Sequence, residues 1–278
     1  MDAPRRVVLL TPGGKLVEAV LAELARRGAP APPVLLYRKA ADRDFRRART
    51  AAGRARALAR LPLLWIRARS AERTHARALV ETCALERTGT LAGARVERNL
   101  RRLAPDVVVL AHCDLVVPRL LAIAREAVVN VHPALLPWIR GNSPIGNSLL
   151  RGVPLGATAF RVDAGIDTGA ILGRRLVPLR GGETLPQLRD ALFQLWVEMT
   201  ADVVEAARSG ALPAGEAHAG RFPLCRSITS PTELAAVDAA VAEDRARALF
   251  DRWAPACEAP GFTLPSGADE SVAPGAGV

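Results

Sequence analysis

The chain has 278 residues, half of them hydrophobic, and a formal net charge of +10 at pH 7. This length suits one large α/β domain with an appendage, or two smaller domains, and the apolar content allows a sizeable core. No apolar run reaches the roughly 18–20 residues that a bilayer-spanning helix needs, and the N-terminus lacks a signal-peptide pattern. We therefore expect a cytoplasmic protein that is not inserted in a membrane.

The first predicted elements alternate between strand and helix. Residues 7–10 form an apolar strand, residues 15–27 a helix with leucine and valine on one stripe, and residues 33–37 the next strand. This order predicts parallel strands joined by a right-handed crossover. The intervening turn at 11–14 lacks the spacing of known phosphate-binding loops, so we interpret it as a plain turn.

The rest of the sequence continues this α/β alternation. Capping boxes at Thr184 and Ser230 mark two helix starts, since each places Gln or Glu three residues after the hydroxyl. The further predicted elements are helices at 39–60, 70–87, 118–125, 184–209 and 230–253 and strands at 105–110, 128–131, 155–162 and 171–179. This pattern predicts an α/β domain over residues 1–204, a helical C-terminal appendage over 205–257 and a disordered tail over 258–278.

The positive charge is concentrated in one part of the chain. Residues 38–102 contain 18 Lys or Arg and 6 Asp or Glu, so the remaining residues carry a net charge of −2. A compositional bias toward arginine on solvated surfaces explains this segment most simply. The alternative is that it borders a pocket for an anionic substrate.

The cysteines and histidines do not suggest a metal site. The four cysteines are scattered without a C-x-x-C pair, and the four histidines lack helical metal-ligand spacing. Reduced thiols fit this pattern better than disulfides or bound zinc. We therefore expect no metal.

Three polar residues stand at the ends of apolar runs. Asn130 and His132 lie two apart on a predicted strand, so they share one face, and Asp167 follows 35 residues after His132 in a glycine-containing loop. Polar groups at the edge of a buried sheet cost free energy unless they have a function there. Each could be structural when taken singly, but together they suggest a catalytic constellation.

The motifs around these residues carry a family resemblance. In order they are Asn130-Val131-His132-Pro133-Ala134-Leu135-Leu136-Pro137, Arg140-Gly141-x-x-Pro144-Ile145, Gly156-Ala157-Thr158 and Asp163-x-Gly165-Ile166-Asp167-Thr168-Gly169. They resemble the formyltransferases, which include methionyl-tRNA, glycinamide ribonucleotide and sugar-nucleotide N-formyltransferases. The likeness runs from about residue 105 to 180 and continues more weakly from residue 5.

The resemblance implies a fold, a cofactor and a set of site residues. The fold is a Rossmann-like open, mostly parallel sheet with the site at the carboxyl ends of its strands. The implied co-substrate is formyl-tetrahydrofolate, and the implied catalytic residues are Asn130, His132 and Asp167. The implied cofactor-binding residues are Asp114, Leu115, Val116, Gly141, Asp163, Gly165 and Ile166.

The expected chemistry is attack of an acceptor amine on the formyl carbon. Asn130 and protonated His132 can donate hydrogen bonds to the oxygen as its negative charge develops. Asp167 can favour the charged imidazole and accept the proton of the amine, directly or through water. Two departures are visible: Ala134 stands where many relatives have serine, and Pro12-Gly13-Gly14 does not reproduce the phosphate loop of the glycinamide enzymes.

The acceptor is less clearly indicated than the reaction. Residues 205–278 carry a net charge of −4, which disfavours a tRNA backbone, so we expect a small, possibly anionic amine and a biosynthetic N-formyltransferase. The alternatives are a formyl-tetrahydrofolate hydrolase, a methionyl-tRNA formyltransferase-like enzyme and an inactive folate-binding protein. The first strand begins near residue 6, so we expect no N-terminal regulatory domain of the hydrolase type. The oligomeric state stays open.

Overall fold

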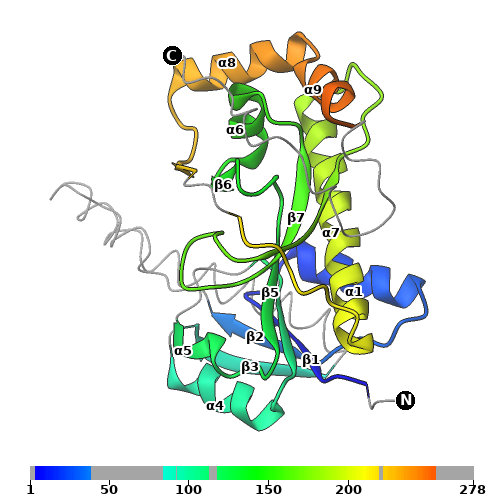
Figure 1. Ribbon diagram of the computed structural model, residues 1–278, viewed down its shortest axis with the longest axis vertical. Helices are drawn as coiled ribbons and strands as arrows, with labels where there is room; N and C mark the ends of the chain where they lie inside the picture. Colours follow the sequence, from blue (N-terminus) through cyan, green and yellow to red (C-terminus); the bar gives the residue numbers. More distant parts are fainter. Residues whose placement is uncertain (1–3, 39–83, 92, 113–117, 219–221, 255–278) are drawn as a thin grey trace, which may run out of the picture. The chain divides into compact units, whose positions relative to one another are not determined.

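A computed structural model describes residues 4–38, 84–91, 93–112, 118–218 and 222–254. The chain divides into two units, residues 1–128 and 129–278, and each is described by itself (Figure 1). The first unit holds β1 (Val7–Thr11), α1 (Lys15–Arg26), β2 (Val34–Arg38), β3 (Leu85–Thr90), α4 (Ala94–Leu103), β4 (Val107–Leu110) and α5 (Pro118–Leu121). The second holds β5 (Ala127–His132, which starts at the boundary), β6 (Arg140–Gly141), α6 (Pro144–Arg151), β7 (Gly156–Arg161), β8 (Ile171–Leu176), α7 (Leu185–Ser209), β9 (Leu224–Cys225), α8 (Pro231–Ala242) and α9 (Arg245–Trp253).

The first unit is a parallel sheet in the order β3-β2-β1-β4. All residues of β1 and β4 are buried, as expected for parallel strands that are covered on both faces. The predicted helix at 70–87 is wrong at its end, because residues 85–87 belong to β3 and pair with β2. Strand pairing there overrides the local helix preference. Residues 39–60 and 70–83 lie outside the described residues.

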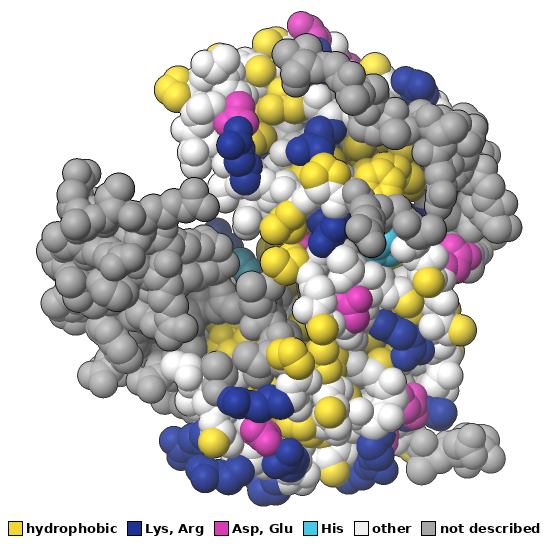
Figure 2. Space-filling model, turned by 60° about the vertical axis from the view of Figure 1, so that its left-hand side comes forward, with side chains coloured by type: hydrophobic (Ala, Val, Ile, Leu, Met, Phe, Trp, Pro, Cys, Tyr) yellow, Lys and Arg dark blue, Asp and Glu magenta, His cyan; other side chains and the backbone are white. Residues whose placement is uncertain are grey.

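Arginines cover the solvent face of α4. Arg95, Arg98, Arg101 and Arg102 are exposed, and Figure 2 shows dark blue side chains along the bottom of its view. Glu97 forms ion pairs with Arg101 at 2.8 Å and with an arginine of α5 at 3.2 Å. This described part of the Arg-rich segment is therefore a solvated, partly paired helix face.

The second unit pairs its strands in antiparallel fashion, in the order β5-β7-β8. The 25-residue α7 packs along β7 (Figure 1), and the indole of Trp196 donates a 2.8 Å hydrogen bond to the carbonyl of Val131. The predicted capping box is present, with Thr184 before the helix and Gly210 in a left-handed conformation after it. Within the described residues, no helix combines the length and apolar character needed to cross a membrane.

The C-terminal part differs from the single helix predicted over 230–253. It forms α8 and α9, which are separated at Asp244, a residue with a positive φ of 51°. Before these helices the chain is extended: Glu216 bridges to Ile171, and β9 pairs in parallel with β6. The helical region expected at the C-terminus is present, but an extended stretch precedes it.

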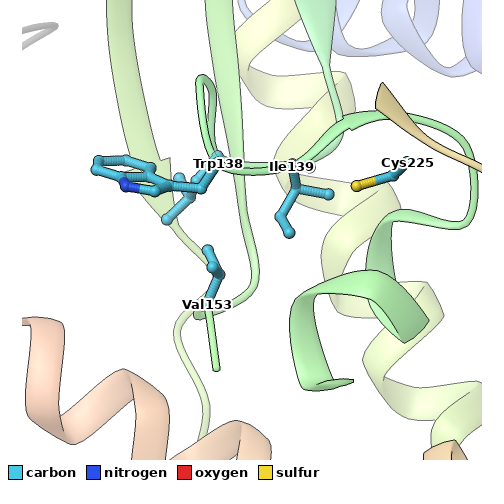
Figure 3. Packing of buried hydrophobic residues seen from close by; sticks show 6 residues of the cluster. Trp138, Ile139, Val153 and Cys225 are labelled. Carbon is cyan, nitrogen blue, oxygen red and sulfur yellow. The ribbon is translucent and has the colours of Figure 1, made fainter. Parts of the chain in front are cut away.

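The segment that joins β5 to β6 contributes most of a small hydrophobic cluster. Its buried members are Ala134, Leu135, Trp138, Ile139, Val153 and Cys225. Figure 3 shows the thiol of Cys225 directed toward Ile139. Phe222 and Trp253 pack edge-on against Trp138, with ring centroids 6.4 and 5.2 Å away. Ile139 is therefore fixed by the packing of its side chain. This matters for the site because its carbonyl contacts the ring of His132.

Thr158 supplies the first testable expectation. Its buried hydroxyl donates to the carbonyl of Ala134 at 2.8 Å and accepts from the backbone N–H of Leu136 at 3.0 Å. Thr158→Val should lower the free energy of unfolding by about 1–3 kcal/mol in urea denaturation, because both backbone groups lose their partner. Thr200→Val is the matched control: its hydroxyl bonds a carbonyl inside α7, so a smaller loss is expected. Equal losses in the two variants would contradict this reading.

Candidate active site

Two of the predicted residues share one face of β5. Asn130 lies opposite Phe160 of β7, and His132 lies opposite Thr158. Directly opposed residues of antiparallel strands point to the same side, so all four side chains lie on one face. His132 is only 7% exposed, whereas Asn130 is half-buried. The strand therefore presents an accessible amide beside a sheltered imidazole.

Asp167 lies in the loop that joins β7 to β8. The loop is braced internally by Asp163, whose Oδ1 accepts from the N–H of Gly165 at 3.0 Å and from the hydroxyl of Thr168 at 2.6 Å. A Cβ on Gly169 would collide with the carbonyl oxygen of Arg161, so only glycine fits there. Asp167 itself has a φ of 52°, in the left-handed region that aspartate enters more readily than most residues. Its carboxylate is thereby aimed back at β5.

The structure brings His132 and Asp167 together. The Nδ1 atom of His132 is 3.8 Å from Oδ2 of Asp167, and the Asp167 side chain is 15% exposed. The other ring nitrogen, Nε2, is 3.1 Å from the carbonyl oxygen of Ile139. Because a carbonyl only accepts, Nε2 carries the hydrogen of this bond. In the neutral ring, Nδ1 is then the basic nitrogen, and it faces Asp167.

Residues 139–141 hold both His132 and Asp167 in place. The carbonyl of Ile139 orients His132, and the backbone N–H of Gly141 donates to Oδ2 of Asp167 at 2.9 Å. Between them, Arg140 donates from Nε and Nη2 to the carbonyl of Ile166 at 2.9 and 2.7 Å. Three successive residues thus fix the imidazole, the carboxylate and the loop that carries it.

Burial sets the protonation of His132. Removal of the ring from water lowers its pKa below 6.5, and this effect outweighs the charge of Asp167 and the bond to Ile139, which both favour the protonated ring. We therefore expect a neutral imidazole in the resting protein at pH 7, in place of the protonated ring expected from the sequence. A neutral ring next to a carboxylate can accept a proton and retain it as a stabilised ion pair.

The remaining predicted residues have mixed placements. Gly141 has a φ of 93°, and a Cβ there would clash with the carbonyl of Cys225, which explains the glycine. Asp163 and Gly165 brace the loop, and the carbonyl of Ile166 is bound by Arg140. These contacts occupy groups that we expected to be available for a cofactor. Asp114, Leu115 and Val116 lie outside the described residues.

Sequence reasoning missed two residues that build the site. Arg140 and Thr158 both stand inside the motifs that carried the family resemblance, but neither received a role. The sequence signal for Arg140 was its place directly before Gly141, whereas the position of Thr158 opposite His132 is seen only in the structure. Each acts on backbone carbonyls, which a residue pattern alone does not reveal.

The chain is similar to known formyltransferases. The formyl transferase family matches residues 5–204. A methionyl-tRNA formyltransferase of Aromatoleum aromaticum is 36% identical over 141 residues, which are 50% of this chain and 43% of that protein. The chain therefore spans less than half the length of this relative.

Solved structures share the fold. A 4-N formyltransferase from Francisella tularensis has a TM-score of 0.55 and 13% identity, with 87% of each chain covered. A sugar N-formyltransferase from Shewanella sp FDAARGOS_354 has a TM-score of 0.53 and 15% identity, with 86% of this chain and 87% of that chain covered. At these identities the likeness concerns the fold alone, and it confirms the expected Rossmann-like α/β class.

One expectation from the sequence is wrong. We disfavoured tRNA as a partner, yet the similar curated relatives are methionyl-tRNA formyltransferases. The net charge of residues 205–278 is a poor guide to tRNA binding, because binding to a phosphate backbone depends on the cationic side chains in contact with it. With residues 5–204 matched, the chain belongs to the formyl transferase family.

Proposed function

We propose that this protein transfers a formyl group from formyl-tetrahydrofolate to the amine of an acceptor substrate. The observation that carries the proposal is the buried His132–Asp167 pair, 3.8 Å apart, beside Asn130 on the same strand as His132. An amide donor, a basic imidazole and a carboxylate are the groups that acyl transfer to an amine requires. No nucleophilic side chain is needed, because the amine is itself the nucleophile.

The side chains of Asn130, His132 and Asp167 suit the chemistry of formyl-tetrahydrofolate. Formyl-tetrahydrofolate would supply a formyl carbon bonded to nitrogen, and the acceptor amine would replace that nitrogen. We propose that the loop of Asp163, Gly165 and Ile166, together with Gly141, lines the folate side. Since the Asp163 carboxylate bonds inside the loop and the Ile166 carbonyl binds Arg140, other backbone groups of the loop would bind the pterin.

The residues of the site can carry the proton that this exchange moves. As the amine adds to the formyl carbon, its nitrogen becomes positively charged and loses a proton, while the departing nitrogen must gain one. Neutral His132 can take that proton on Nδ1 and return it to the leaving nitrogen, and Asp167 stabilises the imidazolium in between. The amide of Asn130 can donate to the formyl oxygen as its charge grows. Protons balance over the whole exchange.

The acceptor itself is a matter for experiment. The small anionic amine suggested by the sequence and the aminoacyl-tRNA in the name of the curated relatives both present a primary amine. Incubation with formyl-tetrahydrofolate and a panel of both kinds, with mass spectrometry for the gain of one formyl group, would identify it. Release of formate without any amine would instead support the hydrolase alternative, and folate binding without turnover would support an inactive protein.

The catalytic roles give a mutational expectation. His132→Ala and Asp167→Asn should each lower kcat by about 10²–10⁴-fold, the usual contribution of a positioned acid or base. The dissociation constant for tetrahydrofolate should change little, because the proposed pterin contacts lie elsewhere. The control is Asp190→Asn, which alters an exposed carboxylate of α7. Turnover at the rate of the unmodified protein in both site variants would refute the assignment.

The lowered pKa of His132 gives a pH dependence of stability. The ring stays neutral in the folded state at a pH where the unfolded ring, with a pKa near 6.5, already binds a proton. The free energy of unfolding is therefore unaffected by protonation of His132 above about pH 6.5. It falls as the pH drops from there toward the pKa of the folded state, by at most about 1.4 kcal/mol per pH unit. Urea unfolding between pH 7.5 and 5.5 should show this loss relative to His132→Gln. Parallel curves for the two proteins would contradict it.

A further inference from the structure

We infer that Arg140 is a positioning residue for the proposed reaction, and that it holds the Asp167 carboxylate against His132 by fastening the loop to the C-terminal segment. Its guanidinium donates from two nitrogens to the carbonyl of Ile166, and from Nη1 to the carbonyl of Phe222 at 2.7 Å. The inference rests on the proposed function for its catalytic consequence. It goes beyond that function because Arg140 touches no reacting group.

Asp167 needs such a restraint. A non-glycine residue in the left-handed region costs roughly 1–2 kcal/mol relative to ordinary backbone conformations. The loop is packed closely against its neighbours, since a Cβ at Gly165 would meet the side chain of Thr168 and one at Gly169 the carbonyl oxygen of Arg161. The carbonyl of Ile166 belongs to the peptide group that enters Asp167. Because two nitrogens of Arg140 donate to this carbonyl, they restrain the backbone directly before Asp167.

The guanidinium of Arg140 acts through its hydrogen bonds to two backbone carbonyls, not through an ion pair. All its described hydrogen bonds end on backbone carbonyls, and within the described part of the chain no carboxylate forms an ion pair with it. Arginine can span two carbonyl groups because its donors are spread over a rigid plane. Lysine keeps the positive charge but concentrates its donors on one nitrogen, so it cannot reproduce both contacts.

The Nη1 atom of Arg140 binds a segment that lies outside the family match. Phe222 lies beyond residue 204, where that match ends, and β9 follows it directly. Leu224 and Cys225 pair with Arg140 and Gly141, and the N–H of Asn142 bonds the carbonyl of Cys225 at 3.1 Å. The position of Asp167 therefore depends on residues 222–225 as well as on the motif that contains it.

The test compares arginine-to-lysine substitutions at Arg140 in β6 and Arg161 in β7, which both bind backbone carbonyls that follow α7. Arg140→Lys should lower kcat by about 100-fold, the scale of a 1 Å misplacement, with a smaller change in either KM. Arg161→Lys is the control: the Arg161 side chain also binds two backbone carbonyls of the C-terminal segment, those of Pro213 and Ala214, neither of which belongs to the loop that carries Asp167. It should leave kcat within about threefold of the unmodified protein.

A titration separates positioning from general stability. Asp167 is the charged group that raises the pKa of His132, so its displacement should lower the pKa further. NMR titration of the His132 ring should therefore show a lower pKa in Arg140→Lys and an unchanged one in Arg161→Lys. The inference is overturned if Arg140→Lys keeps the original pKa, or if both variants lose kcat in proportion to their melting temperatures. If the protein shows no formyl transfer at all, the proposed function fails, but the titration still decides the role of Arg140.

Discussion

The site depends on the backbone of residues 139–141. One carbonyl and one N–H from this short segment orient the imidazole of His132 and the carboxylate of Asp167, which come from distant parts of the sequence. Backbone groups position partners more rigidly than side chains do, because they have no rotamers to lose. The hydrophobic cluster around Ile139 keeps that segment in place. The apolar packing of Ile139 and the polar contacts of Ile139 and Gly141 therefore act together to position the site.

Electrostatics in this arrangement involve two opposing effects. Burial favours a neutral imidazole, while the nearby carboxylate favours a charged one, and burial prevails in the resting protein. A base must be unprotonated before it acts and must tolerate a proton afterwards. The 3.8 Å separation from Asp167 is consistent with both requirements, since it is close enough for Coulombic stabilisation without forming a hydrogen bond in the resting state.

Much of the fold could be predicted from the sequence because its signals are local. The apolar runs at β1 and β4, the capping box before α7 and the glycine after it are read directly from neighbouring residues. The misassigned end of the predicted helix at 70–87 and the missed strands β6 and β9 have a different origin. β3, β6 and β9 exist through pairing with other segments, and two-residue strands leave no periodic pattern. The split between α8 and α9 at Asp244 likewise follows from backbone geometry.

For the site, sequence reasoning identified the pair that the structure brings together but not the groups that position it. His132 and Asp167 carry chemistry in their side chains, so their residue types were informative. The contributions of Ile139 and Gly141 come from the main chain, which every residue possesses, and the contacts of Arg140 end on carbonyls of Ile166 and Phe222. Such roles have no compositional signature. They become visible only when distant backbone segments are placed side by side.

The tight glycines of the β7–β8 loop limit how this scaffold can diversify. With Gly165 and Gly169 closed against Thr168 and Arg161, a side chain at either place would have to displace the loop itself. Engineering or natural drift toward a new acceptor would therefore have to act through surfaces beyond this hairpin. Pro213 and Ala214 bind Arg161 through main-chain carbonyls, so their side chains can change without loss of these contacts, which makes this pair a natural place for such variation.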